Sequence, residues 1–205
     1  MLNINSRFRK LQNNELQLFA KSCKNMVVYE LGGTFNENNK IYYLDVKNYI
    51  ISNIDHKVCD IVEDVTSLSF SSDSIERIVC ISVLQHIYDY NKAISEIIRV
   101  LKPGGKALIT NGFLFPICMQ EDYVRLTPRF WERRLQEEAV KYEIKKLGNR
   151  YSVMENLLMR PYGRMGGLFG LINKVLAQVF KVLSKVQNKK DSYPLGLAVY
   201  IEKNN

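Results

Sequence analysis

The stretch that decides the fold is Ile78–Gly105, IVCISVLQHIYDYNKAISEIIRVLKPGG. Its first five residues, up to Ser82, are rich in β-branched side chains and predict a short buried strand. Apolar residues then recur at spacings of three and four from Ala93 to Leu101, which is typical of an amphipathic helix. A lysine, a proline and two glycines end that helix, and the apolar run 106–110 predicts another strand. The stretch is therefore one strand–helix–strand unit, and such units belong to parallel sheets.

Three motifs occur in order along this part of the chain: LSFSSDSIERIV from Leu68, VLQHIYD from Val83 and RVLKPGG from Arg99. Together they resemble the class I S-adenosylmethionine-dependent methyltransferases, in particular the type 11-like branch with the pattern D-x-x-x-LPF-x-x-x-SFD-x-V, VLEH and RVLKPGG. The resemblance covers the chain from about Val27 to Trp131. It implies an α/β fold with a doubly wound, mostly parallel, seven-stranded Rossmann-like sheet, and S-adenosylmethionine as the cofactor.

The composition fits one globular domain. The chain has 205 residues, of which 46% are hydrophobic and 24% charged. We divide it into an N-terminal helix (1–26), a cofactor-binding core (27–150), a basic helical insertion (151–190) and a last strand (191–205). The N-terminal sequence has no signal core and no run has the length of a membrane span, so we expect a cytoplasmic protein. The four cysteines stand far apart without a CxxC pair, which predicts neither a metal site nor disulfides.

The net charge of +8 is unevenly distributed. Residues 30–128 carry nine cations and thirteen anions, whereas residues 129–190 carry fourteen cations and five anions. A basic C-terminal region of this kind attracts nucleic acid, an anionic membrane surface or a phosphorylated substrate, or it is simply a solvated face. The chain lacks an N-P-P-Y type motif after the fourth strand, so nucleic acid is the least favoured of these partners.

The predicted first strand, Val27–Leu31, runs into a glycine turn. Ligands of open parallel sheets bind beyond the carboxyl ends of the strands, where glycine lets the backbone approach them closely. The resemblance implies that Glu30, Gly32 and Gly33 bind the cofactor, although Thr34 stands where the family has its second glycine. Few residues separate this turn from the next acid-bearing run, so we expect a shortened first crossover.

Acidic residues end the next two predicted strands. Residues 41–46 predict a second strand with Asp45 at its end, where one carboxylate accepts hydrogen bonds from both hydroxyls of a ribose. The alternative is an aspartate that caps the following turn. Residues 58–65 predict a third strand, and the resemblance implies that Asp64 and Val65 contact the adenine ring.

The loop after the fourth strand faces the transferred methyl group in the resembling family. The resemblance implies that Ser82 binds the cofactor and that Gln85, at the position of the family's glutamate, contacts the substrate. Histidine is the residue type whose unperturbed pKa suits a base at neutral pH, and this loop has one, His86. It is therefore a candidate to accept the proton of the nucleophile, and the alternative is that it only fixes the loop.

A later loop is similar to a D-Y-x-R-x-T element of family members encoded with cell-surface polysaccharide synthesis enzymes. It supplies Asp122 as a second candidate catalytic group, with Tyr123 and Arg125 as candidate substrate contacts. The equally weighted alternative is that Asp122 and Arg125 only pair with each other and hold the loop shut. Thr127 and the proline after it predict the start of a helix.

The region before the last strand contains a basic amphipathic helix. Within residues 166–186 aliphatic side chains face one side and lysines another, a pattern typical of helices that lie in a membrane interface. The alternatives are packing on the domain's own core or against a second copy in a homodimer.

The function that these observations favour is methyl transfer from S-adenosylmethionine to an oxygen of a small-molecule or glycan-type acceptor. A rival from another class is a non-catalytic methyltransferase-like adaptor that binds a protein or the inner face of the membrane.

Overall fold

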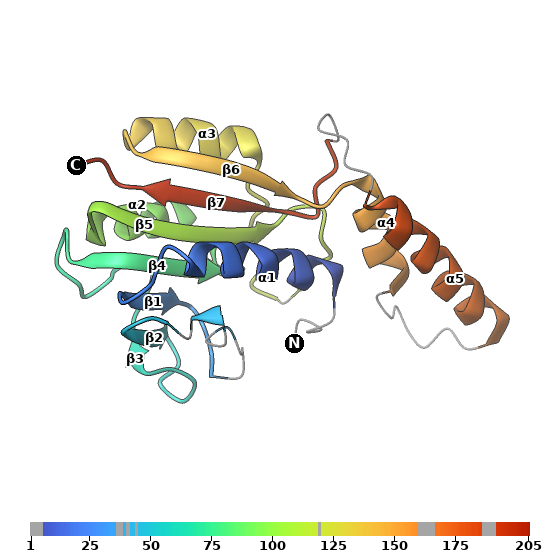
Figure 1. The fold of residues 1–205 in the computed structure, drawn as a ribbon, viewed down its shortest axis with the longest axis horizontal. Coiled ribbons are helices and arrows are strands. Elements are labelled where there is room, and N and C mark those ends of the chain that lie inside the picture. Colours follow the sequence, from blue (N-terminus) through green and yellow to red (C-terminus); the bar gives the residue numbers. More distant parts are fainter. Residues whose placement is uncertain are drawn as a thin grey trace.

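The computed structural model describes residues 6–35, 39, 42–43, 45–118, 120–159, 167–185 and 192–205. Its centre is one sheet of seven strands in the order β3-β2-β1-β4-β5-β7-β6 (Figure 1). The strands are β1 (Val27–Leu31), β2 (Asn48–Asn53), β3 (Ile61–Val62), β4 (Ile75–Ile81), β5 (Leu101–Gly112), β6 (Lys141–Leu147) and β7 (Gly196–Glu202). Strands β1 to β5 pair in parallel, and β7 runs antiparallel to both of its neighbours. The predicted fold class is confirmed.

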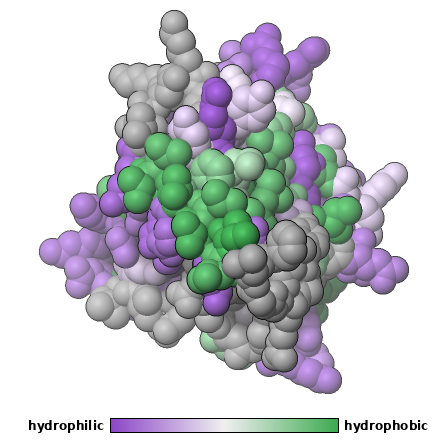
Figure 2. Space-filling view, turned by 90° about the vertical axis from the view of Figure 1, so that its right-hand side faces the viewer, coloured by the Kyte–Doolittle hydropathy of each residue, from purple (hydrophilic) through white to green (hydrophobic). Residues whose placement is uncertain are grey.

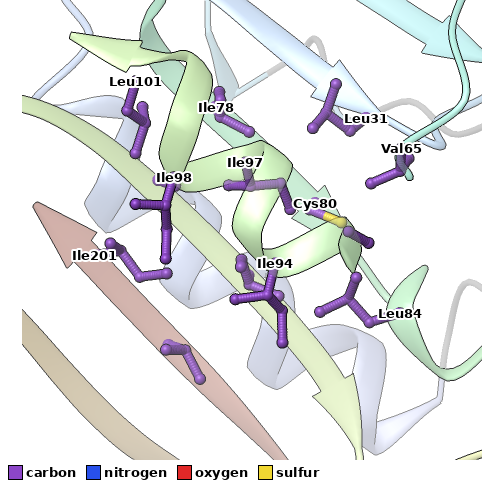
Figure 3. Close-up of a cluster of buried hydrophobic side chains, with 14 of the residues drawn as sticks. Leu31, Val65, Ile78, Cys80, Leu84, Ile94, Ile97, Ile98, Leu101 and Ile201 are labelled. Atoms are coloured by element: carbon purple, nitrogen blue, oxygen red, sulfur yellow. The ribbon is translucent and has the colours of Figure 1, made fainter. Parts of the chain in front are cut away.

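Helices cover both faces of the sheet. They are α1 (Arg7–Ala20), α2 (Tyr90–Val100), α3 (Pro128–Glu137), α4 (Arg150–Met159) and α5 (Gly167–Leu183), and a 3₁₀ turn lies at Leu84–His86. Helix α1 buries Phe8, Leu16 and Phe19 against one face. On the other face α2 buries Ile94 and Ile97 against the sheet, in the cluster that Figure 3 shows. These two layers follow directly from the apolar periodicity of the helices.

Helices α4 and α5 lie between β6 and β7 in the chain and form a hairpin. Figure 1 shows this hairpin projecting past the end of the sheet at which β4 and β6 finish. No helix in the described ranges is long and apolar enough to cross a membrane.

The predicted second strand is wrong. Strand β2 begins at Asn48, after the predicted run 41–46, of which residues 41 and 44 lie outside the described part of the chain. The amide of Lys47 donates a backbone hydrogen bond of 2.9 Å to the carbonyl oxygen of Met26, which directly precedes β1. Lys47 therefore lies beside the start of β1, and β2 begins only after it. The described residues between β1 and β2 contain no α-helix, as the short first crossover predicted. Of the predicted third strand, 58–65, only Ile61 and Val62 form β3.

Candidate functional site

The turn after β1 places two glycines at the carboxyl end of the sheet. Gly32 has a φ of +72°, and a Cβ atom on it would lie 2.5 Å from Cγ2 of Val83 in the turn after β4. A Cβ atom on Gly33 would lie 2.5 Å from the carboxylate carbon of Glu30. Both positions therefore require glycine, one for its backbone angle and both for space. The backbone at Gly32 and Gly33 therefore has no side chain at the position where the resemblance implies that a cofactor binds.

Glu30 lies beneath this turn. Its side chain is buried, and its two oxygens accept hydrogen bonds from Asn39 Nδ2 at 2.5 Å and from the Tyr49 hydroxyl at 2.8 Å. The Asn39 oxygen in turn accepts one from Arg9 of α1 at 2.5 Å. Glu30 therefore ties α1, β2 and the β1–β2 connection together, and it acts on the glycine turn by holding the segments around it.

Asp45 lies at the amino end of the parallel strands, whereas the glycine turn lies at their carboxyl end. It precedes β2 instead of following it, and its carbonyl oxygen accepts a hydrogen bond of 2.9 Å from the amide of Asn25, just before β1. The acid that does follow β2 is Asp55, two residues beyond Asn53. Its side chain is 54% exposed, and Oδ1 accepts a hydrogen bond from the backbone amide of Lys57. The prediction that Asp45 ends the second strand is wrong, and Asp55 has that position.

Asn53 links the ends of β1 and β2. Its Nδ2 donates a hydrogen bond of 2.8 Å to the carbonyl oxygen of Gly33. The glycine turn and the Asp55 loop are therefore held side by side at the carboxyl end of the sheet. Sequence reasoning missed both Asn53 and Asp55, because it assigned the strand to the preceding apolar run.

Asp64 and Val65 follow β3 at the same end. Asp64 is exposed, and its Oδ1 accepts hydrogen bonds of 2.8 Å from both the amide and the hydroxyl of Thr66. The Val65 side chain is buried in the core cluster with Leu31 and Ile97. The carboxylate is thus accessible to a ligand, whereas the valine can offer a ligand only its backbone.

Ser82 follows β4 in the left-handed region, with a φ of +57°. Its hydroxyl accepts a hydrogen bond of 2.7 Å from Nε2 of Gln12, a fully buried residue of α1 that also reaches Thr110 at 2.7 Å. Sequence reasoning missed Gln12, because the apolar pattern of a helix does not indicate that a glutamine donates hydrogen bonds to residues at the ends of β4 and β5.

Gln85 and His86 connect the turn after β4 to the loop before α3. Gln85 is buried, its Oε1 accepts from the amide of Gly112 at 3.3 Å, and its carbonyl accepts from the amide of Tyr123 at 2.8 Å. His86 Nδ1 lies 2.7 Å from the carbonyl oxygen of Glu121. Because a carbonyl oxygen only accepts, Nδ1 carries the proton and Nε2 keeps its lone pair. Gln85 therefore connects the turn after β4 to β5 and to the loop before α3. In the neutral imidazole of His86, Nε2 is the nitrogen that can accept a proton.

Asp122 and Arg125 form the ion pair that sequence analysis gave as an alternative. Arg125 donates to both carboxylate oxygens, and the Cys118 amide donates to Oδ2 at 3.0 Å. The guanidinium, followed by this amide, lowers the pKa of Asp122 below its ordinary value although burial opposes the shift. The Asp122 side chain is only 1% exposed. A carboxylate held this firmly in its charged form is a poor proton acceptor, so the arrangement favours loop closure as its role.

An open cavity of about 530 Å³ lies beside this loop. Its lining is mostly apolar and includes the pair just described: Phe113, Leu114, Phe115, Pro116, Ile117, Asp122, Tyr123, Val124, Arg125, and Val153 and Leu157 of α4. Tyr123 is 53% exposed and packs edge-to-face on Tyr88, with ring centroids 5.6 Å apart. Tyr123 and Arg125 therefore line the same cavity, and their role in substrate binding stays a prediction.

The described residues contain no group of three or more His, Cys, Asp or Glu side chains that could hold a metal ion.

Parts of the sequence are similar to known proteins. Residues 22–109, less than half of the chain, match the family model described as a methyltransferase domain. A demethylmenaquinone methyltransferase of Mycobacterium marinum is 29% identical over 80 residues, which are 37% of this chain and 35% of that protein. An uncharacterized protein of Methanocaldococcus jannaschii is 30% identical over 104 residues, 46% of either chain. The matches thus span less than half of the length of these relatives.

Solved structures match the whole architecture. A SAM-dependent methyltransferase from Archaeoglobus fulgidus superposes with a TM-score of 0.62 at 13% identity, over 97% of this chain and 95% of that one. The chain has the methyltransferase fold. A Haemonchus contortus phosphoethanolamine N-methyltransferase, solved with S-adenosylhomocysteine, shares it with a TM-score of 0.60 and 16% identity, over 94% of this chain and 53% of that one. The [4+2]-cyclase SpnF also has this fold, with a TM-score of 0.62 and 14% identity over 98% and 84% of the two chains. The methyltransferase fold therefore does not by itself decide the reaction.

Proposed function

We propose that this protein transfers a methyl group from S-adenosylmethionine to a nucleophile of a small acceptor molecule. The observation that carries the proposal is the bare glycine turn at Gly32 and Gly33, flanked by carboxylates on two neighbouring strand ends. The match of residues 22–109 to a methyltransferase domain supports it, as do relatives and structural neighbours described as methyltransferases.

The residues present at the carboxyl end of the sheet fit this cofactor. Asp55 follows the second strand with an exposed carboxylate, which suits two adjacent ribose hydroxyls. Asp64 follows the third strand, where an exposed carboxylate can accept a hydrogen bond from an exocyclic amine. Gly32, Gly33 and Ser82 offer backbone groups beside them. When bound, S-adenosylmethionine supplies an electrophilic methyl group.

We assign to His86 the role of general base, which accepts the proton of the acceptor molecule's nucleophile. Its Nδ1 is committed to Glu121, so its ring orientation is fixed and Nε2 is the atom that receives the proton. Asp122 is not needed as a base in this scheme, because its pKa is lowered and both oxygens are occupied by Arg125. It instead holds Arg125 at the wall of the cavity.

The cavity beside this loop is the proposed acceptor site. Its aromatic and aliphatic lining, with Tyr123 and the Arg125 guanidinium at one side, suits a molecule that has an apolar face and a polar end. We propose oxygen as the methylated atom, with a small molecule or a glycan of cell-surface polysaccharide synthesis as the acceptor. Cys23, Cys59 and Cys80 are buried and form no disulfide, which suits a reducing compartment such as the cytoplasm.

The experiment is transfer of a labelled methyl group. The intact protein is incubated with methyl-tritiated S-adenosylmethionine and fractionated cell extract, and labelled acceptors are recovered from the aqueous and organic phases. We expect label in one fraction, reduced on the order of a hundredfold or more by His86→Gln because general-base catalysis is lost. A control is Glu132→Gln, which removes an exposed ion pair of α3 with Arg129 and leaves the base and the proposed cofactor residues intact. Equal transfer by wild type and His86→Gln would remove His86 from the chemistry.

A second candidate function is a non-catalytic adaptor, and the specific observation that favours it is the exposed apolar surface of α5. An adaptor would transfer no labelled methyl group to any fraction of the extract and would not need to bind S-adenosylmethionine. Absence of both transfer and cofactor binding would therefore replace the proposed enzyme with the adaptor.

A further inference from the structure

Helix α5 turns its apolar side to solvent. Its large aliphatic residues recur at spacings of three and four and are 37% to 63% exposed: Leu171, Ile172, Val175, Leu176, Val179, Val182 and Leu183. The opposite side of the helix carries Ala177, which is buried, as is Ser184 just beyond the end of the helix. This is the reverse of a helix that packs on a globular core, where the aliphatic face is inside. Figure 2 shows hydrophobic side chains gathered on this end of the molecule.

The exposure does not come from a loose hairpin. Tyr151 of α4 stacks on Phe180 of α5 with ring centroids 6.4 Å apart. Ser184, just after α5, accepts a hydrogen bond of 3.1 Å from Arg7 on its hydroxyl and one of 2.9 Å from Asn149 on its carbonyl. Arg7 also pairs with Glu155 of α4 at 3.7 Å. The hairpin is therefore fixed to α1 at its base, and α5 holds its apolar face outward.

Positive charge accompanies this face. Lys174, Lys181 and Lys185 are exposed and follow one another at helical spacing along one flank of α5. From residue 156 to residue 190 the sequence has seven lysines and arginines and no acidic residue. Anionic headgroups attract such a segment, and an adjoining aliphatic face then enters the boundary between headgroups and acyl chains. A second copy of this chain would instead set two basic segments against each other, which like-charge repulsion opposes.

We propose that α5 binds the surface of an anionic lipid bilayer, with its aliphatic face in the interface and its lysines at the headgroups. A helix of 17 residues is about 25 Å long and carries two lysines, so it lies along the interface and does not span it. The adjoining α4 contributes Val153 and Leu157 to the lining of the acceptor cavity, so the proposed membrane helix packs against an element of that cavity. Residues 166 and 186, which bound the surface expected from the sequence, lie outside the described residues, as do the side chains of 167–169.

The test is co-sedimentation of the intact protein with vesicles. We expect it to pellet with phosphatidylcholine vesicles that contain about one-third phosphatidylglycerol, and to remain in solution with pure phosphatidylcholine. Val175→Asn with Val179→Asn should weaken binding on the order of tenfold or more, since it removes the centre of the inserted face. Lys174→Gln, Lys181→Gln and Lys185→Gln together should weaken it similarly and abolish most of its sensitivity to salt.

Matched variants control for general effects on solubility and charge. Leu18→Asn with Val62→Asn replaces two aliphatic residues whose exposures of 49% and 58% match the 48% and 57% of Val179 and Val175. Arg129→Gln, Arg133→Gln and Lys141→Gln remove three exposed cations elsewhere. Both control variants should bind vesicles as the intact protein does.

Two results would overturn the proposal. One is failure of the intact protein to pellet with anionic vesicles, or pelleting that Val175→Asn with Val179→Asn leaves unchanged. The other is a dimer in light scattering that this double variant dissociates, without any vesicle binding, because the face would then belong to a second copy of the chain. Neither result depends on methyl transfer, so the proposed enzyme can fail or stand separately.

Discussion

Gly32 and Val83 touch across the ends of β1 and β4, so closely that a Cβ atom on the glycine would lie 2.5 Å from Val83 Cγ2 and 2.7 Å from Cγ1. The two turns at the centre of the sheet's carboxyl end therefore pack directly on each other. Any side chain at position 32 would push them apart at the place where we propose that the cofactor binds.

Gly32→Ala should lower the free energy of unfolding more than Gly104→Ala. Both glycines have a φ of +72°, so an alanine at either position loses about 1–2 kcal/mol to the left-handed backbone. At Gly104 the added Cβ atom would meet only the side-chain oxygen of Asn205 at 3.3 Å, whereas at Gly32 the clash with Val83 adds about 1–3 kcal/mol. Urea unfolding of the two variants measures the difference.

A further substitution separates the clash from the backbone cost at Gly32. Val83→Ala in the Gly32→Ala background should recover most of the additional loss, because it removes the two atoms that the new Cβ atom meets. Equal destabilisation of Gly32→Ala and Gly104→Ala would show that the two turns do not pack as described.

Gln12→Ala should loosen α1 from the sheet. Gln12 Nε2 lies 2.7 Å from both the Ser82 and Thr110 hydroxyls, and the residue is fully buried. Its loss leaves two strand ends without that donor and opens a cavity, at a cost of about 2–4 kcal/mol. Denaturant unfolding should show this loss and faster amide exchange in α1. Asn14→Ala, at an exposed position of the same helix, is the control; a similar effect of both variants would contradict the assigned role.

Asp122→Asn should be destabilising at neutral pH and less so in acid. Arg125 lowers the pKa of Asp122 in the folded protein, so ionisation of Asp122 stabilises the fold above the unfolded pKa of about 3.9. That stabilisation disappears as the pH falls through the lower folded pKa. We therefore expect a loss of about 2–3 kcal/mol at neutral pH, shrinking below about pH 4.

The measurement for Asp122 is the free energy of unfolding of both proteins across this pH range. Glu132→Gln, which removes an exposed ion pair with Arg129, should cost less than about 0.5 kcal/mol throughout. A cost of Asp122→Asn that stays constant down to pH 3 would show that the ion pair is not its source.

Much of the fold could be predicted because local signals agreed with the global arrangement. The β-branched run of β4 and the periodicity of α2 each indicated one structure, and the structure has it. The predicted boundary after the helix was wrong: α2 ends at Val100, and residues 102–105 lie within β5, which begins at Leu101. Thr127 caps α3 as predicted, accepting a hydrogen bond of 3.1 Å from the amide of Phe130. Such signals depend on neighbours in the sequence, so they can be recognised without tertiary structure.

The second strand could not be predicted in the same way. Two successive runs, YYLDV from Tyr42 and NYIISNID from Asn48, both combine strand-forming residues with an aspartate near the end. The choice between them is made by pairing with β1, where Val27 lies opposite Asn48 and Leu31 opposite Ser52. Register with a partner strand is a long-range property, and it moved the candidate ribose acid from Asp45 to Asp55.

Several candidate site residues also bind other segments of the chain, which the sequence could not show for a related reason. Glu30 and Gln85 satisfy buried hydrogen bonds, and Asp122 is closed by Arg125. Sequence reasoning could name these polar residues, but their partners come from distant segments. Only the tertiary structure separates a polar residue that meets a ligand from one that holds a loop.

The measurement that tests this account most directly is calorimetric titration with S-adenosylmethionine and S-adenosylhomocysteine of the intact protein and two variants, Asp55→Ala and Asp45→Ala. The account predicts micromolar binding by the intact protein, weakened on the order of tenfold to a hundredfold by Asp55→Ala and unchanged by Asp45→Ala. Binding that Asp45→Ala removes and Asp55→Ala leaves intact would contradict the position of the site at the carboxyl end of β2. Absence of binding to the intact protein would contradict the proposed enzyme.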